Sequence, residues 1–163
     1  MSGFSEVPAA WAPPCKVVRM GVEVGCGLTR SYLAVKRTTY SMPKILVVED
    51  NLDTREFIHL HLITEGLNVV LAANGQEGLY LASVEHPDLI ITDIEMPVLD
   101  GIEMVKKLRS QPETQNIPIL VLTAFGKEVI DSSIRAGANR AMAKPVLLDE
   151  LMNDVRELLS PKG

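Results

Sequence analysis

The sequence predicts an α/β fold in which a parallel sheet of five strands is covered by helices on both faces. Five short apolar runs recur after residue 42, and each is followed by a segment of helical length. The runs are apolar at consecutive positions, which is typical of strands buried on both faces of a parallel sheet. Five βα units in about 120 residues therefore predict one small doubly wound domain.

The predicted strands span residues 45–48, 69–72, 89–92, 119–123 and, with a weaker pattern, 138–143. The predicted helices fill the gaps at about 53–65, 75–84, 101–110, 127–136 and 148–159.

Capping residues support these boundaries. The spacing of a capping box occurs three times, in the pairs Asp53 and Glu56, Asn74 and Glu77, and Asp100 and Glu103. Gly66 and Gly137 stand where helix-ending glycines are expected. Leu147 has no side-chain oxygen, so the helix that begins after it lacks a cap, at a cost of about 1 kcal/mol.

The chain divides into an N-terminal extension, residues 1–41, and a folded domain, residues 42–163. The extension shows no sustained helical or strand period, and three prolines and four glycines interrupt it. It is either a disordered leader or upstream sequence translated ahead of a true start at Met42. We favour the second, because the first strand begins almost directly after Met42; an anchor or docking arm is a third option.

Composition excludes several classes of protein. Residues 42–163 hold 11 Lys and Arg against 19 Asp and Glu, so direct nucleic-acid binding is not expected. No apolar run approaches the roughly 18 residues that span a bilayer, and no secretory signal is present. Both cysteines lie in the extension, so neither a disulfide nor a zinc site organises the domain. We therefore expect a cytoplasmic protein without a membrane segment.

Polar side chains follow four of the five predicted strands. Glu49 and Asp50 end the first, Asp93 the third, Thr123 the fourth, and Lys144 the fifth. The carboxyl ends of parallel strands meet at one edge of the sheet, where doubly wound folds bind ligands.

Three carboxylates at that edge would repel one another unless a hard divalent cation lay among them, and Mg²⁺ suits oxygen ligands. A metal there would also position a phosphoryl group, so Asp93 could act as a nucleophile and become an aspartyl phosphate. Lys144 could stabilise the phosphate oxygens, and the Thr123 hydroxyl could donate to one of them.

Residues 42–160 resemble a response-regulator receiver domain of two-component signalling. The matching segments are "ILVVEDN", "DLIITDIEMPVLDG", "IPILVLTA" and "AKP". The resemblance implies a flavodoxin-like fold with strand order 2-1-3-4-5. It also implies that Asp93 accepts phosphate from a phosphohistidine of a sensor histidine kinase or histidine phosphotransfer protein.

The resemblance further implies that Glu49, Asp50, Asp93 and the backbone carbonyl of Glu95 hold Mg²⁺, and that the peptide bond after Lys144 is cis. Phosphorylation would repack the surface of helix four, strand five and helix five. That surface would then bind an output protein, whose identity is unknown, or a second copy in a phosphorylation-dependent homodimer.

Ala141 departs from the family pattern. Three residues before the lysine the family usually has an aromatic side chain, often Tyr or Phe, that rotates as the threonine moves. Alanine has no rotamer to switch. Coupling from phosphate to the output surface must therefore use another residue or another movement.

Only "SPKG" follows the last predicted helix, so we expect a stand-alone response regulator, not an enzyme, that catalyses only its own phosphorylation and dephosphorylation. Two alternatives remain. One is a receiver-like scaffold that no longer uses phosphate. The other, less favoured, is a magnesium-dependent phosphohydrolase that works through an aspartyl phosphate. Its relatives place the nucleophile on the first strand, whereas Asp93 follows the third.

Overall fold

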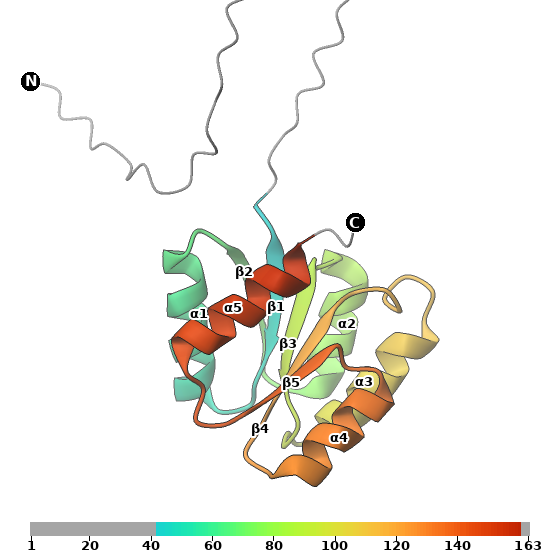
Figure 1. Ribbon diagram of the computed structural model, residues 1–163. Helices are drawn as coiled ribbons and strands as arrows, with labels where there is room; N and C mark the ends of the chain where they lie inside the picture. Colours follow the sequence, from blue (N-terminus) through green and yellow to red (C-terminus); the bar gives the residue numbers. More distant parts are fainter. Residues whose placement is uncertain (1–41, 161–163) are drawn as a thin grey trace, which may run out of the picture. The chain divides into compact units, whose positions relative to one another are not determined.

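The computed structural model describes residues 42–160, in which five strands and five helices alternate along the chain. The parallel sheet has the order β2-β1-β3-β4-β5 (Figure 1). The flavodoxin-like fold and strand order are thus confirmed. The expected extension, residues 1–41, lies outside the described residues. Among the residues described, no helix is long and apolar enough to cross a bilayer.

The strands are β1 (Lys44–Val48), β2 (Asn68–Ala72), β3 (Leu89–Asp93), β4 (Ile119–Thr123) and β5 (Arg140–Ala143). The helices are α1 (Leu52–Thr64), α2 (Gly75–Glu85), α3 (Gly101–Ser110), α4 (Lys127–Ala136) and α5 (Leu148–Leu159).

Alternate residues of each central strand enter two separate cores. Leu46 and Ile90 face the side covered by α2, α3 and α4, whereas Val47 and Ile91 face the side covered by α1 and α5. All four side chains are fully buried or nearly so. Burial on both faces explains why β1, β3 and β4 read as continuous apolar runs.

Two of the three predicted caps are confirmed and one is wrong. Asn74 accepts from the backbone N–H of Glu77 at 2.9 Å, and Asp100 accepts from that of Glu103 at 2.8 Å. The first helix instead begins after Asn51, whose Oδ1 accepts from the N–H of Thr54 at 2.9 Å. Asp53 lies within the first turn, because the extended backbone that a cap requires occurs at Asn51.

The ends of α1 and α4 also follow from the backbone. Gly66 and Gly137 adopt φ of +80° and +114°, as expected for helix-ending glycines. Strand β5 begins at Arg140, two residues later than predicted, because the N–H of Ala138 still donates to Ser133 at the end of α4. Leu147 precedes α5 and makes no side-chain cap, as predicted.

Arg109 joins the end of α3 to the segments that precede β4 and β5. Its guanidinium donates to the carbonyls of Gly137, Gln115 and Ile117 at 2.8 to 3.0 Å, and to Oδ1 of Asn139 at 2.8 Å. The same Asn139 oxygen accepts from the N–H of Ile119. Arg109 therefore satisfies polar backbone groups at the amino ends of two strands.

Candidate phosphoacceptor site

Strand order places the acidic side chains next to one another. β1 pairs with β3 in parallel register, Val48 opposite Thr92, so Glu49 and Asp93 follow at neighbouring strand ends. Lys144 comes directly after β5, and its backbone N–H donates to the carbonyl of Thr123 at 2.7 Å. The predicted convergence on one edge of the sheet is therefore present.

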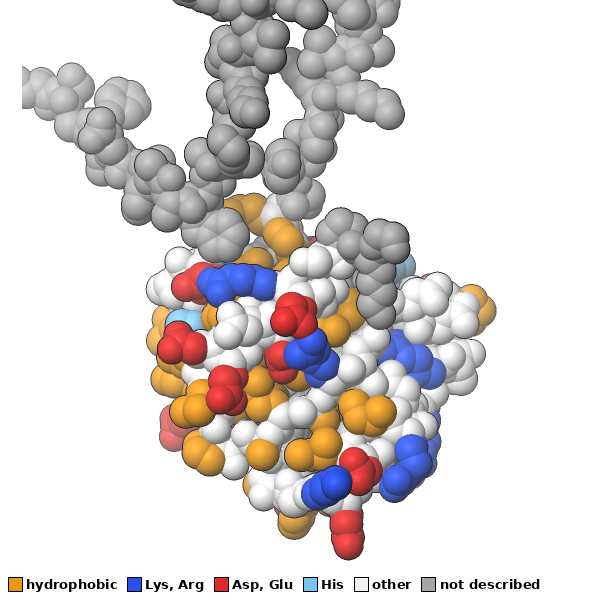
Figure 2. Space-filling model, in the orientation of Figure 1, with side chains coloured by type: hydrophobic (Ala, Val, Ile, Leu, Met, Phe, Trp, Pro, Cys, Tyr) orange, Lys and Arg blue, Asp and Glu red, His pale blue; other side chains and the backbone are white. Residues whose placement is uncertain are grey.

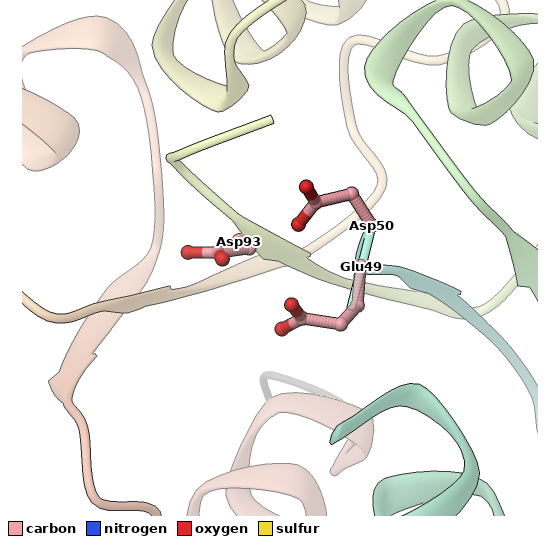
Figure 3. A group of neighbouring side chains, drawn as sticks. All are labelled: Glu49, Asp50 and Asp93. Atoms are coloured by element: carbon pink, nitrogen blue, oxygen red, sulfur yellow. The ribbon is translucent and has the colours of Figure 1, made fainter. Parts of the chain in front are cut away.

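Glu49, Asp50 and Asp93 each offer a carboxylate oxygen within 4.8 Å of the others. Figure 3 shows the three side chains extending into the same space beyond β1 and β3. Glu49 and Asp93 are buried, whereas Asp50 is exposed. An exposed acid beside two buried ones leaves the cluster open to solvent on one side.

Lys144 is the cation that the structure places in this cluster. Its Nζ donates to Oε2 of Glu49 and to Oδ2 of Asp93, both at 2.8 Å. Three carboxylates against one ammonium leave a surplus of negative charge. A surplus of this kind favours a further cation.

Burial and hydrogen bonding act in opposite directions on the cluster. Burial raises the pKa of Glu49, with a further rise from the Asp93 charge, although the bond from Lys144 lowers it. For Lys144, burial alone would lower the pKa, but the hydrogen bonds that it donates to Asp93 and Glu49, together with the charges of these carboxylates, outweigh burial and raise the pKa. Lys144 therefore remains an ammonium at neutral pH.

Backbone contacts position Asp93. Its Oδ1 accepts from the N–H of Ile94 at 2.6 Å. The N–H of Gly101 donates to the carbonyl of Ile94 at 3.0 Å, which closes the loop after β3. A Cβ on Gly101 would lie 2.1 Å from the Asp93 carbonyl oxygen, so only glycine allows this close approach.

Sequence reasoning missed Arg55. Its guanidinium donates to the backbone carbonyl of Glu49 at 2.6 Å and approaches that of Asp50 at 3.4 Å. It thus holds the backbone of the acidic pair from the first turn of α1. The available signal was a basic residue one turn into the helix that follows the acidic pair. The sequence does not show its partners, however, because they are backbone carbonyls and not side chains.

The remaining predicted residues lie around this cluster. Thr123 ends β4, is fully buried, and its Oγ1 accepts from the N–H of Phe125 at 3.0 Å. Glu95 is exposed in the loop after β3. Ala141 lies on β5, half-buried against the core that α2, α3 and α4 cover. The peptide bond between Lys144 and Pro145 is cis, as the resemblance implied.

The cluster has the chemistry of a site for phosphoryl groups. A buried carboxylate at a strand end can act as a nucleophile, and an ammonium bonded to it can stabilise anionic oxygens. All the side-chain acceptors are carboxylate oxygens, the ligands that Mg²⁺ prefers.

Comparison with known proteins identifies the family. Residues 45–156 match the family model described as the response regulator receiver domain. Sporulation initiation phosphotransferase F of Bacillus subtilis is 35% identical over 121 residues, covering 74% of this chain and 96% of that protein. The chain spans only about half, 48% and 54%, of the length of the transcriptional regulators that it also matches.

Solved structures agree with the sequence comparison. The chemotaxis response regulator CheY4 of Vibrio cholerae is 33% identical with a TM-score of 0.69, covering 72% of this chain and 99% of that chain. The receiver domain of a Pseudomonas aeruginosa sensor histidine kinase is 30% identical with a TM-score of 0.67, covering 73% and 98% of the two chains. That domain is described with a magnesium ion coordinated in its active-site cleft. With its fold, its acidic cluster and these matches, the chain belongs to the response regulator receiver domain family.

Proposed function

We propose that this receiver domain accepts a phosphoryl group on Asp93 from a phosphohistidine of a sensor histidine kinase or a histidine phosphotransfer protein. The phosphorylated state then switches a surface that binds another protein. The observation that carries the proposal is the placement of Asp93, a buried carboxylate at a strand end whose Oδ2 lies 2.8 Å from the Lys144 ammonium.

The transfer uses side chains already in the cluster. A carboxylate oxygen of Asp93 forms a bond to phosphorus as the bond from phosphorus to the donor's imidazole nitrogen breaks, and the imidazole keeps that electron pair. Lys144, which is bonded to Asp93 before the transfer, is placed to donate to the phosphate oxygens after it. For Thr123 we propose a hydroxyl that donates to one of these oxygens, because the N–H of Phe125 uses its oxygen as an acceptor and leaves the hydroxyl hydrogen free to donate.

Glu49, Asp50, Asp93 and the backbone carbonyl of Glu95 are the groups that we propose for Mg²⁺. The oxygen-only donor set and the excess of carboxylates over Lys144 suit this ion. A bound Mg²⁺ would neutralise charge on the transferred group. Arg55, through its bond to the Glu49 carbonyl, keeps two of the carboxylates in position for it.

The test is phosphorylation of the full chain with acetyl phosphate and Mg²⁺, read by intact mass and phosphate-affinity electrophoresis. We expect one phosphate that requires Mg²⁺ and is absent in Asp93→Asn. Asp131→Asn, the same change on the exposed surface of α4, is the matched control and keeps the phosphate. Phosphate that persists in Asp93→Asn, or none from acetyl phosphate or kinase donors, would contradict the proposal.

The proposal limits catalysis to the domain's own phosphorylation and dephosphorylation. Because the phosphorylated domain also dephosphorylates itself, small phosphate esters are expected to release phosphate no faster than Asp93 loses its own phosphate. Faster, sustained turnover of such esters would show a phosphohydrolase instead.

Ala141 favours a second candidate, a receiver-like scaffold that works without phosphate. Its methyl group offers no side-chain rotation by which β5 could respond to Asp93. The two candidates separate in cells, because a scaffold keeps its signalling in Asp93→Asn whereas a phosphorylation switch loses it.

A further inference from the structure

Thr92 is a polar residue in an otherwise apolar part of the sheet. It precedes Asp93 on β3, and the register places Val48 of β1 and Val121 of β4 on either side of it. Every residue of β3 is buried, and Figure 2 shows one of the two faces, with α5 in front, closed by side chains. The Thr92 side chain is fully buried, so its hydroxyl costs free energy unless it is hydrogen-bonded.

One peptide group connects this hydroxyl to the phosphoacceptor carboxylate. The Thr92 hydroxyl donates to the backbone carbonyl of Asp93 at 2.9 Å. The same peptide group carries the N–H of Ile94, which donates to Oδ1 of Asp93 at 2.6 Å. Because a peptide group is planar, holding its carbonyl also sets the direction of its N–H. Thr92 therefore acts on the Asp93 carboxylate through the backbone.

The start of α3 confines the same carbonyl. A Cβ added to Gly101 would lie 2.1 Å from the Asp93 carbonyl oxygen, so the backbone of Gly101 lies close against it. Gly101 limits where the carbonyl can move, but its approach does not supply a hydrogen bond to that oxygen. The Thr92 hydroxyl supplies one, and a bonded carbonyl polarises its peptide group, which strengthens the bond that the Ile94 N–H donates.

Each oxygen of the Asp93 carboxylate thus has its own donor. Oδ1 accepts from the N–H of Ile94, and Oδ2 accepts from Nζ of Lys144 at 2.8 Å. If the peptide group tilted, Oδ1 would lose its donor and Lys144 alone would hold the carboxylate. A carboxylate that rotates about one bond spends less time aligned with an incoming phosphorus atom.

We propose that Thr92 is a positioning residue for phosphoryl transfer, because it holds the peptide group that orients the Asp93 carboxylate. The inference rests on the proposed function, since this carboxylate is the proposed phosphoacceptor. Packing alone does not require a hydroxyl at this position. Valine is also β-branched and of similar shape, so it fills the space between Val48 and Val121 but donates no hydrogen bond.

The first test measures the rate at which the full chain is phosphorylated by acetyl phosphate and Mg²⁺, followed by intact mass. We expect Thr92→Val to react about tenfold more slowly, as for loss of a group that orients a ligating carboxylate. Thr92→Ser keeps the donor but loses a buried methyl group, so it should have a lower Tm and a rate close to that of the unchanged protein.

Thr114→Val is the matched control. The Thr114 side chain is also fully buried, and its hydroxyl donates to the carbonyl of Leu108 at 2.9 Å, beyond the end of α3. This variant loses the same kind of hydrogen bond away from Asp93, so we expect its rate to be unchanged. Thr92→Ala also removes the donor and is smaller than threonine, which keeps the test available if Thr92→Val fails to fold.

The second test reads the Ile94 amide in two-dimensional ¹H–¹⁵N spectra of the unphosphorylated full chain. A short bond to a carboxylate moves an amide proton downfield, so we expect the Ile94 proton to lie downfield and to move upfield in Thr92→Val and Thr92→Ala. It should stay in place in Thr92→Ser and Thr114→Val. An unchanged rate or an unchanged Ile94 signal in both donor-free variants would overturn the proposal. A rate in Thr92→Ser or Thr114→Val as low as in Thr92→Val would also overturn it.

Failure of this inference and failure of the proposed function are distinguishable. The Ile94 signal is measured without phosphate, so its dependence on the Thr92 hydroxyl can be established even if Asp93 accepts no phosphate. That result would contradict the proposed function and leave the support of the carboxylate assigned. Phosphorylation of Asp93 at equal rates with and without the Thr92 hydroxyl would instead contradict the positioning role alone.

Discussion

Lys144 and Arg109 are partly buried cations at opposite ends of the same sheet, and their partners differ in kind. At the carboxyl ends of the strands Lys144 donates to two carboxylate side chains, Glu49 and Asp93. At the amino ends of β4 and β5 Arg109 donates to backbone carbonyls and one amide. Neutral acceptors are satisfied once bonded, whereas a carboxylate cluster keeps a net charge that a ligand can change. One end is therefore suited to chemistry and the other to holding the fold.

Glycines at the two ends give the largest expected contrast. Gly101→Ala would set a methyl group against the Asp93 backbone, so we expect a loss of at least about 3 kcal/mol in unfolding free energy. Gly137→Ala meets a movable part of Arg109 and a strained φ, with an expected loss of about 1–2 kcal/mol. Urea denaturation of both variants measures the difference, and equal losses would show that the two contacts are equally tolerant.

Replacing each cation by methionine tests the difference in partners. Arg109→Met leaves the part-buried carbonyls of Gly137 and Ile117 without this donor, and we expect a loss of roughly 3 kcal/mol in unfolding free energy that Mg²⁺ does not change. Lys144→Met leaves Glu49 and Asp93 without a cation. With a chelator present to remove metal, we expect the unfolding free energy to fall by about 2 kcal/mol, less than for a fully buried pair because the site is partly solvated.

Mg²⁺ then separates the two variants. It should restore most of the stability of Lys144→Met, because a divalent cation can balance the carboxylate charges that Lys144 no longer balances. Thermal denaturation with and without about 10 mM Mg²⁺, an excess intended to saturate the site, measures the gain in stability of each variant. Stabilisation of Arg109→Met by Mg²⁺, or no stabilisation of Lys144→Met, would contradict this difference between the two ends of the sheet.

A substitution at Asp50 tests the metal affinity of the acidic cluster without changing its two buried carboxylates. Asp50→Asn removes the charge of the exposed carboxylate, so we expect Mg²⁺ to bind about tenfold more weakly while the protein without metal keeps its stability. Calorimetric titration with Mg²⁺ measures the affinity. Asp53→Asn, an exposed aspartate in the first turn of α1, is the control, and an equal effect there would point to general surface charge.

The smallest expected effect concerns the start of α5. Leu147→Asp supplies the missing cap, because an Asp oxygen at this position can accept from the N–H two or three residues later. Leu147 is 56% exposed, so little packing is lost. We expect the unfolding free energy to rise by about 0.5–1 kcal/mol. Leu147→Ala should not raise it, and a gain there would rule out capping as the cause.

Local pattern was sufficient to predict most of the fold. The buried runs of β1, β3 and β4 showed as uninterrupted apolar residues, since each strand is covered on both faces. The cap of α1 was misassigned because Asp53 has the Glu three residues later that a capping box requires, whereas Asn51 accepts from the backbone N–H of Thr54 and needs no particular side chain there. Backbone conformation alone distinguishes the two pairs.

Local patterns in the amino-acid sequence were enough to show which residues end the strands, because apolar periodicity and turn residues are local properties. They therefore predicted that Glu49, Asp93 and Lys144 would share one edge. The folded arrangement of the strands was needed to show that Lys144 bonds to Glu49 and Asp93, which are 95 and 51 residues away. Likewise, the carbonyl partners of Arg109 depend on how separate elements pack, and no local period encodes these contacts.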